Sequence, residues 1–70
     1  MGNLEEQLGT RMKSLRLARS LPVEALAGHL GITELQVAGI EAGKQQLKPE
    51  HLLLVCELFG TTVEEFMQGI

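Results

Sequence analysis

The 70-residue sequence has no tryptophan or tyrosine, two phenylalanines and one cysteine. With Cys56 alone, the chain cannot form an internal disulfide, which fits a reducing cytoplasm. Two aromatic side chains are too few for a stacking platform that binds single-stranded nucleic acids. No apolar run approaches the roughly 20 residues of a membrane span, and no basic segment precedes an apolar one as in a signal peptide. We therefore expect a cytoplasmic protein with no membrane partner.

The sequence also lacks any grouping of residues typical of a catalytic or metal site. His29 and His51 fall in different predicted helices, and neither has metal-ligand spacing to the other or to Cys56. No cluster of acid, base and nucleophile indicates catalysis. We expect no enzyme activity, no metal and no cofactor.

Basic residues are few. Six lysines and arginines stand against nine acidic residues, which gives a net charge of −3 and a pI near 5.2. Small DNA-binding modules usually carry a basic footprint, so this balance argues mildly against nucleic acid. Four of the six basic residues nevertheless fall within the segment 11–19, which leaves room for a local basic patch.

Hydrophobic residues make up 44% of the chain and recur with helical spacing throughout, as in a globular all-α protein. Capping-box spacings mark three helix starts, at Asn3, Thr33 and Thr62. Glycines and prolines divide the chain into five predicted helices without a long linker. The predicted helices span 3–19, 22–30, 34–42, 49–59 and 63–67. We expect residues 1–70 to form one domain, which could be the N-terminal domain of a longer protein.

The segment 22–42 has the pattern of a helix-turn-helix unit. Two helices joined by a tight turn must touch near it, which favours the small Ala27 in the first helix. The turn itself favours positive φ, which Gly31 adopts readily. Val37 and Ile40, three residues apart, would line the inner face of the second helix. This combination indicates a helix-turn-helix.

From about residue 8 to 67 the chain resembles the Cro/C1, or XRE-type, class of phage-repressor helix-turn-helix domains. The matching stretches are LGTRMKSLR, EALAGHLGIT, GIEAGK and LLLVCELFGTTVEEF. The resemblance implies a five-helix, lambda-repressor-like fold and a bacterial or phage transcription regulator that is nucleoid-associated if it binds DNA. It also implies a homodimer on double-stranded DNA, with the helix at 34–42 in the major groove.

The resemblance assigns roles to individual residues. The base-reading candidates are Glu34, Leu35, Gln36 and Ala38. The phosphate candidates are Arg11, Lys13, Lys44 and Gln45. Arg16 and Glu41 stand where the family commonly pairs an arginine with a glutamate, so we expect a clamp between their helices; the alternative is two solvated charges.

The chain also departs from the family pattern. Val23 replaces a glutamine that often braces the recognition helix, Gly39 offers no side chain, and the segment 34–42 has no arginine or lysine. An alternative function is therefore a helix-turn-helix domain used for dimerisation or for docking on another transcription protein.

Surplus apolar residues bear on this alternative. We expect Leu17, Leu35 and Leu47 to be exposed, alone or in an interface. In the helix at 49–59 the expected core face is Leu52, Leu53, Val55, Cys56 and Phe59. The interface candidates are Leu54, Leu58, Phe66, Met67 and Ile70, although Phe66 also fits the core and the leucines could simply enlarge it.

Overall fold

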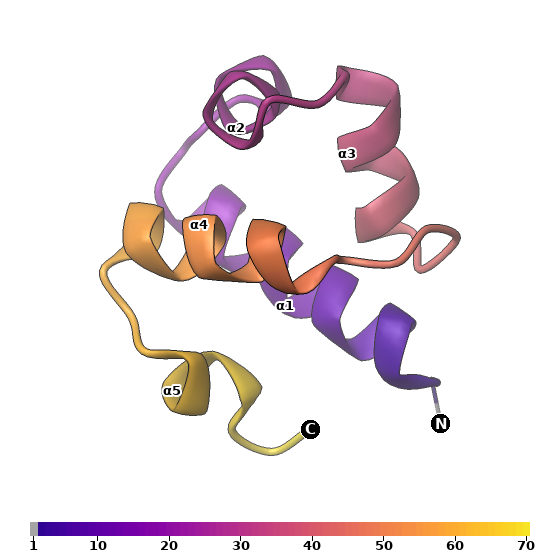
Figure 1. Ribbon diagram of the computed structural model, residues 1–70, viewed down its shortest axis with the longest axis vertical. Coiled ribbons are helices and arrows are strands. Elements are labelled where there is room, and N and C mark those ends of the chain that lie inside the picture. Colours follow the sequence, from indigo (N-terminus) through magenta and orange to yellow (C-terminus); the bar gives the residue numbers. More distant parts are fainter. Residues whose placement is uncertain (1) are drawn as a thin grey trace.

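The structure is a computed structural model that describes residues 2–70. These residues form five α-helices joined by short loops and contain no strand (Figure 1). The helices are α1 (Leu4–Ala18), α2 (Val23–Leu30), α3 (Glu34–Glu41), α4 (Pro49–Phe59) and α5 (Val63–Met67). Each end lies within one residue of its predicted position, so the predicted all-α fold is confirmed. In this part of the chain no helix has the length and apolar character needed to cross a membrane.

Reciprocal capping boxes begin three of the helices, as predicted. In each box the first side chain accepts from a backbone N–H three residues later, and the later side chain accepts from the N–H of the first residue. The pairs are Asn3 with Glu6, Thr33 with Gln36, and Thr62 with Glu65. The hydrogen bonds from Thr62 hold the pKa of Glu65 below its ordinary value.

The helix ends depend on left-handed residues. Gly31 has a φ of 70°, and the N–H of Ile32 then donates to the carbonyl of Ala27 across the turn between α2 and α3. α1 ends in the same way without a glycine. Ser20 adopts a φ of 53°, and the N–H of Leu21 donates to a carbonyl one turn back. A side chain in this region is disfavoured, so α1 ends at some cost in conformational energy.

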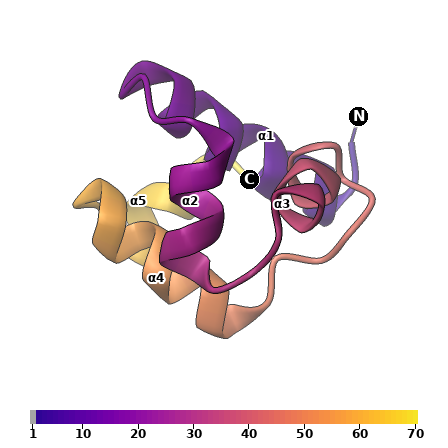
Figure 2. The ribbon, with the colours of Figure 1, turned by 90° about the horizontal axis from the view of Figure 1, so that it is seen from above.

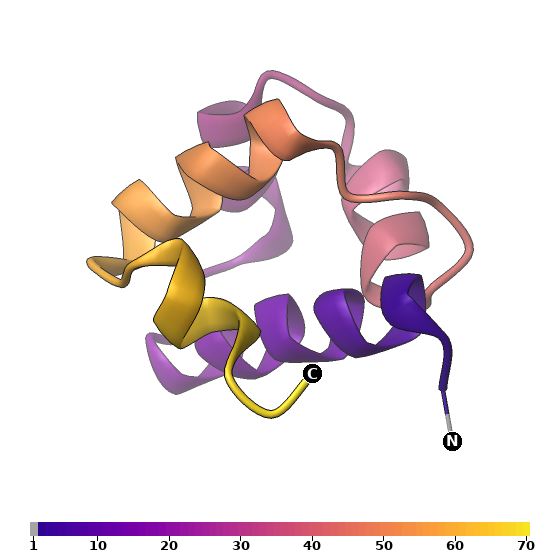
Figure 3. The ribbon, with the colours of Figure 1, turned by 60° about the horizontal axis from the view of Figure 1, so that its bottom comes forward.

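The helices surround a single core. α3 packs against both α1 and α2, α2 also contacts α4, and α4 contacts α5. Viewed from above, α2 crosses the middle of the molecule and α3 is seen almost end-on beside it (Figure 2). Figure 3 shows the segment after α5 returning towards α1. The largest fully buried side chains are Met12, Leu26, Val37, Val55 and Phe66.

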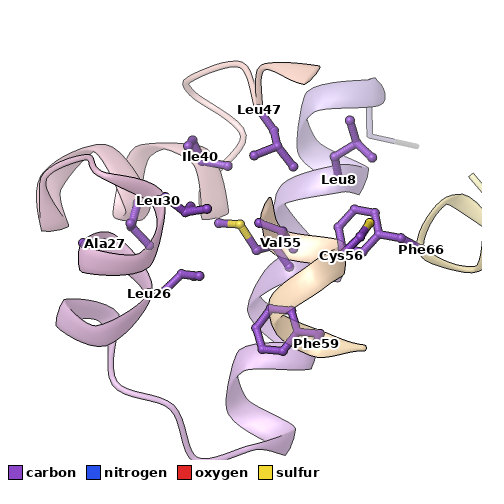
Figure 4. Packing of buried hydrophobic residues seen from close by; sticks show 12 residues of the cluster. Leu8, Leu26, Ala27, Leu30, Ile40, Leu47, Val55, Cys56, Phe59 and Phe66 are labelled. Carbon is purple, nitrogen blue, oxygen red and sulfur yellow. The ribbon is translucent and has the colours of Figure 1, made fainter. Parts of the chain in front are cut away.

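Two leucines lie on the opposite side from the one predicted. Leu47 was expected to be exposed, but it is 5% exposed and belongs to the core cluster with Ile40 and Leu8 (Figure 4). The loop after α3 turns back over the core there, which no helical periodicity could reveal. Leu53 was expected in the core and is 61% exposed. Successive residues of a helix point about 100° apart. The face of α4 that carries Val55, Cys56 and Phe59 packs in the core, and Leu53 lies outside that face.

A close backbone contact joins α1 to α3. A Cβ atom on Gly9 would overlap the carbonyl oxygen of Ile40 and lie 3.2 Å from the Cα of Glu41. Just beyond α3, a Cβ on Gly43 would overlap the side chain of Glu6. A glycine inside a helix lowers helix stability by about 1 kcal/mol relative to alanine. At Gly9 this cost is offset because the two backbones can touch.

An ion pair holds the same two helices together. Arg16 donates from Nε to Glu41 Oε2 at 2.8 Å and from Nη2 to Oε1 at 3.1 Å. Its Nη1 donates to the carbonyl of Leu21 in the loop before α2. Both charged side chains are less than one-tenth exposed, and the hydrogen bonds to Glu41 raise the pKa of Arg16 against the opposing effect of burial. The expected clamp is present, and the alternative of two solvated charges is wrong.

We predict that Gly9→Ala lowers the free energy of unfolding by about 2 kcal/mol, because the added methyl group must push α1 and α3 apart. Gly28→Ala is the matched control. Gly28 also lies inside a helix, and a Cβ there would meet nothing within 4 Å. This control should gain up to about 1 kcal/mol from helix propensity. Urea unfolding followed by circular dichroism measures both variants, and equal stability would contradict the close contact.

We also predict that Glu41→Gln costs about 3 kcal/mol, because it leaves the buried Arg16 charge without its counter-charge. Glu57→Gln, on the exposed side of α4, should change stability by less than about 0.5 kcal/mol. Thermal and urea unfolding at neutral pH compare the two variants. A loss below about 1 kcal/mol for Glu41→Gln would contradict this prediction, because an ion pair screened by solvent contributes no more than that.

Candidate nucleic-acid interface

α2 and α3 form the helix-turn-helix unit predicted for residues 22–42. Ala27 is buried where the two helices meet, and Val37 and Ile40 anchor the inner face of α3 in the core. Gly31 supplies the left-handed turn, and the capping box at Thr33 starts α3 directly after it. The inner face of α3 is therefore held by α1 and α2, which leaves its outer face to solvent.

All four predicted base-reading residues lie on exposed positions of α3: Glu34, Leu35, Gln36 and Ala38. Leu35 is 82% exposed, the largest value among the large apolar side chains in the described part of the chain. Gln36 is partly engaged, because its Oε1 accepts from the N–H of Thr33 at 2.8 Å. Its amide nitrogen remains the only side-chain donor that α3 presents.

A shallow groove of about 500 Å³ runs along this outer face. Its lining residues are Leu35, Ala38, Gly39, Ala42, Lys44 and Gln45. A Cβ on Gly39 would lie 3.0 Å from side-chain atoms of Gln45. The missing side chain at Gly39 therefore has a structural consequence, because it lets Gln45 lie against α3. Gln45 thus borders the groove instead of reaching freely towards a phosphate.

Arg11, predicted as a phosphate contact, forms hydrogen bonds within the domain, and its role on DNA stays a prediction. Its two terminal nitrogens donate to the carbonyls of Phe66 and Gln68, each at 2.8 Å. The last carbonyls of a helix have no intrahelical partner and attract a cation. Arg11 therefore caps α5 and fastens the C-terminal segment to α1.

Arg19 has a comparable structural role. Its guanidinium donates to the carbonyl of Phe59 at the end of α4 at 2.7 Å, and it lies 5.4 Å from the centre of the Phe59 ring. With Arg11 and Arg16, all three arginines are engaged within the domain. Arg19 is nevertheless exposed, and so are the three lysines, Lys13, Lys44 and Lys48.

Two of these lysines flank α3. Lys44 borders the groove described above, and Lys48 borders a second hollow of about 250 Å³ that Gln36 and His51 also line. Lys13 lies on α1 between Gly9 and Arg16, the two residues that contact α3. Sequence reasoning missed Lys48, although its position in the loop directly after the helix-turn-helix unit could have indicated it.

The interface candidates divide into two groups. Phe66 is 1% exposed and fills the core, so it offers no surface and its assignment to an interface is wrong. Met67 and Ile70 are half-buried in the C-terminal segment, and Leu54 and Leu58 are half-buried on α4. These four retain some accessible apolar surface.

The remaining titratable residues form no further site in the described part of the chain. Cys56 is buried in the core, and burial raises the pKa of its thiol. Among residues 2–70, no three side chains of His, Cys, Asp or Glu gather as metal ligands.

Two proteins of known structure have a similar fold. Two crystal structures of the clp gene regulator ClgR from Corynebacterium glutamicum are each 24% identical to this chain. One has a TM-score of 0.86 and covers 96% of this chain and 87% of that chain; the other has a TM-score of 0.88 and covers 94% and 70%. The restriction-modification controller protein C.AhdI from Aeromonas hydrophila is 25% identical, with a TM-score of 0.80 over 90% of this chain and 96% of that chain.

A family match agrees with this fold. No curated protein matches the chain in sequence. The family described as "Helix-turn-helix domain", however, matches residues 7–67, which include all of α2, α3, α4 and α5 and most of α1. As the resemblance to Cro/C1-type domains predicts, the chain belongs to the helix-turn-helix domain family.

Proposed function

We propose that the domain binds double-stranded DNA as part of a transcription regulator, with α3 entering the major groove. The observation that carries the proposal is the outer face of α3, which is exposed along its length on a helix-turn-helix scaffold. Two proteins with this fold are described as a gene regulator and a controller protein, which supports a regulatory role.

The charges around α3 support a specific set of phosphate contacts. Lys44 and Lys48 follow α3, and Lys13 lies on the helix that α3 packs against. Phosphate contacts made by lysine position a protein on the duplex without reading its sequence. We assign Lys13, Lys44 and Lys48 to this role, with Gln45 as a neutral neighbour.

The base contacts belong to the first turns of α3. Glu34 can accept a hydrogen bond from a cytosine amino group, and the free amide nitrogen of Gln36 can donate to a base acceptor. Leu35 and Ala38 can contact only apolar groups. This is a weak hydrogen-bonding set, so affinity depends heavily on the lysines.

We further propose that the domain acts as a homodimer on two half-sites about one helical turn apart. A single domain offers three exposed lysines, and pairing would double them. Met67 and Ile70 are the best placed of the half-buried apolar residues, because the C-terminal segment that carries them is fixed to α1 by Arg11.

A second function, docking on another protein, is favoured by one observation. The groove on α3 carries Leu35, which is unusually exposed, within a chain whose net charge is −3. An exposed apolar surface of this kind also suits a protein partner. Leu35→Lys separates the two functions, because the added charge should preserve or strengthen DNA binding but disrupt an apolar protein contact.

A salt series tests DNA binding. We expect binding to a labelled mixed-sequence duplex, measured by fluorescence anisotropy, to weaken with salt at a log–log slope of about −3 per domain, since three lysines each release counterions. Lys44→Ala should make the slope shallower by about 1. Arg19→Gln also removes one positive charge but should leave the slope unchanged, because Arg19 already binds the carbonyl of Phe59 and lies outside the proposed dimer contact. Absence of binding at about 50 mM salt would refute the proposal.

Light scattering tests the dimer. At high micromolar concentration we expect the mass of two chains, and Met67→Glu should shift it towards one chain by placing a charge in the apolar contact. Leu17→Glu is the control, since Leu17 is an exposed leucine on α1 outside the proposed contact. A single-chain mass for the unaltered protein at that concentration contradicts self-association.

A further inference from the structure

The outer face of α3 lacks the side chains that usually read bases by hydrogen bonds. Guanine is most often recognised by an arginine or lysine that donates to both N7 and O6, and α3 has neither residue type. Adenine is read by an amide that donates and accepts at once. In Gln36 the accepting oxygen is already engaged with the N–H of Thr33. Both common bidentate contacts are therefore unavailable to α3.

What α3 presents instead is an apolar stripe. Leu35, Ala38, Gly39 and Ala42 are spaced i, i+3, i+4 and i+7, so they share one face of the helix. All four line the same groove, and Leu35 stands at its edge with most of its surface exposed. At Gly39 the side chain of Gln45 packs against α3 and lines the groove. Lys44 borders the groove and supplies a positive charge beside it.

The edges of DNA bases offer one apolar group in the major groove, the methyl group on C5 of a pyrimidine. Thymine carries it, and so does 5-methylcytosine at the equivalent atom. We infer that the groove on α3 selects DNA by pyrimidine 5-methyl groups, with Leu35 as the main contact and Ala38 beside it. This inference rests on the proposed DNA-binding function. Lys44 favours DNA as the occupant, because a phosphate backbone would lie next to its charge.

The test removes or adds the methyl group and nothing else on the base. Affinities are measured by anisotropy at one fixed salt concentration for four duplexes. Two are an alternating adenine–thymine duplex and the same duplex with deoxyuridine for thymidine. The other two are an alternating guanine–cytosine duplex and its 5-methylcytosine form. We expect the methyl-bearing duplex of a pair to bind at least about fourfold more tightly, as for one buried methyl group.

The two pairs distinguish the sources of the methyl group. Preference within both pairs assigns recognition to the methyl group itself, and preference within one pair assigns it to thymine or to 5-methylcytosine. Equal affinity within both pairs, with binding retained, overturns the inference but leaves DNA binding intact. No binding to any of the four duplexes overturns the proposed function, and the inference with it.

Matched leucine variants separate contact by Leu35 from an effect of the methyl group on duplex shape. Leu35→Ala should bring the affinity ratio within each pair close to 1. Leu53→Ala removes another exposed leucine, on α4 outside the groove, and should leave the ratio unchanged. Because both leucines are exposed, both variants should keep the native fold by circular dichroism. A full ratio retained in Leu35→Ala overturns the assignment to this residue.

Discussion

The contact between α1 and α3 at Gly9 is the constraint on which the presentation of α3 depends. Without a side chain at Gly9, the two backbones meet, and the carbonyl of Ile40 occupies the space that a Cβ would need. Arg16, about two turns further along α1, then reaches Glu41 and ties the loop before α2 into the same contact. α3 is only eight residues long, too short to be stable by itself in water. Its position is therefore set by packing against α1 and α2, and its outer face is exposed to solvent.

The hydrogen-bond and ion-pair partners of the individual charged side chains describe the electrostatics of the domain better than its net charge does. The three arginines hold the fold together, since each donates to carbonyl oxygens or to Glu41. The three lysines are exposed, and two of them flank α3. A net charge of −3 thus conceals a local arrangement in which the cations next to α3 are the accessible ones. Much of the negative charge lies in the first turns of helices, where carboxylates interact favourably with the helix dipole.

Local sequence was a good guide to the helices, because capping residues and turns act over three or four positions. The Arg16–Glu41 pair was predictable only through the family resemblance, as its members lie 25 residues apart. The burial of Leu47, the exposure of Leu53 and the partners of Arg11 were not predicted, for a different reason. Their environments are made by distant segments: a loop that folds over the core at Leu47, the helices that pack against α4, and the carbonyls at the end of α5 that bind Arg11. The importance of Gly9 was missed too, although a glycine inside a helical pattern often marks close packing.

Arg11 has a consequence for the reach of a paired molecule on DNA. It fixes the carbonyls of Phe66 and Gln68 to the helix that also carries Gly9 and Arg16. The C-terminal segment and α3 are thus both fixed to α1, with no hinge between them. In a dimer joined at the C-terminal segment, α1 would therefore set the distance between the two copies of α3. A duplex whose half-sites did not match that distance would have to bend or twist to be bound, and the stiffness of the DNA would then contribute to selectivity.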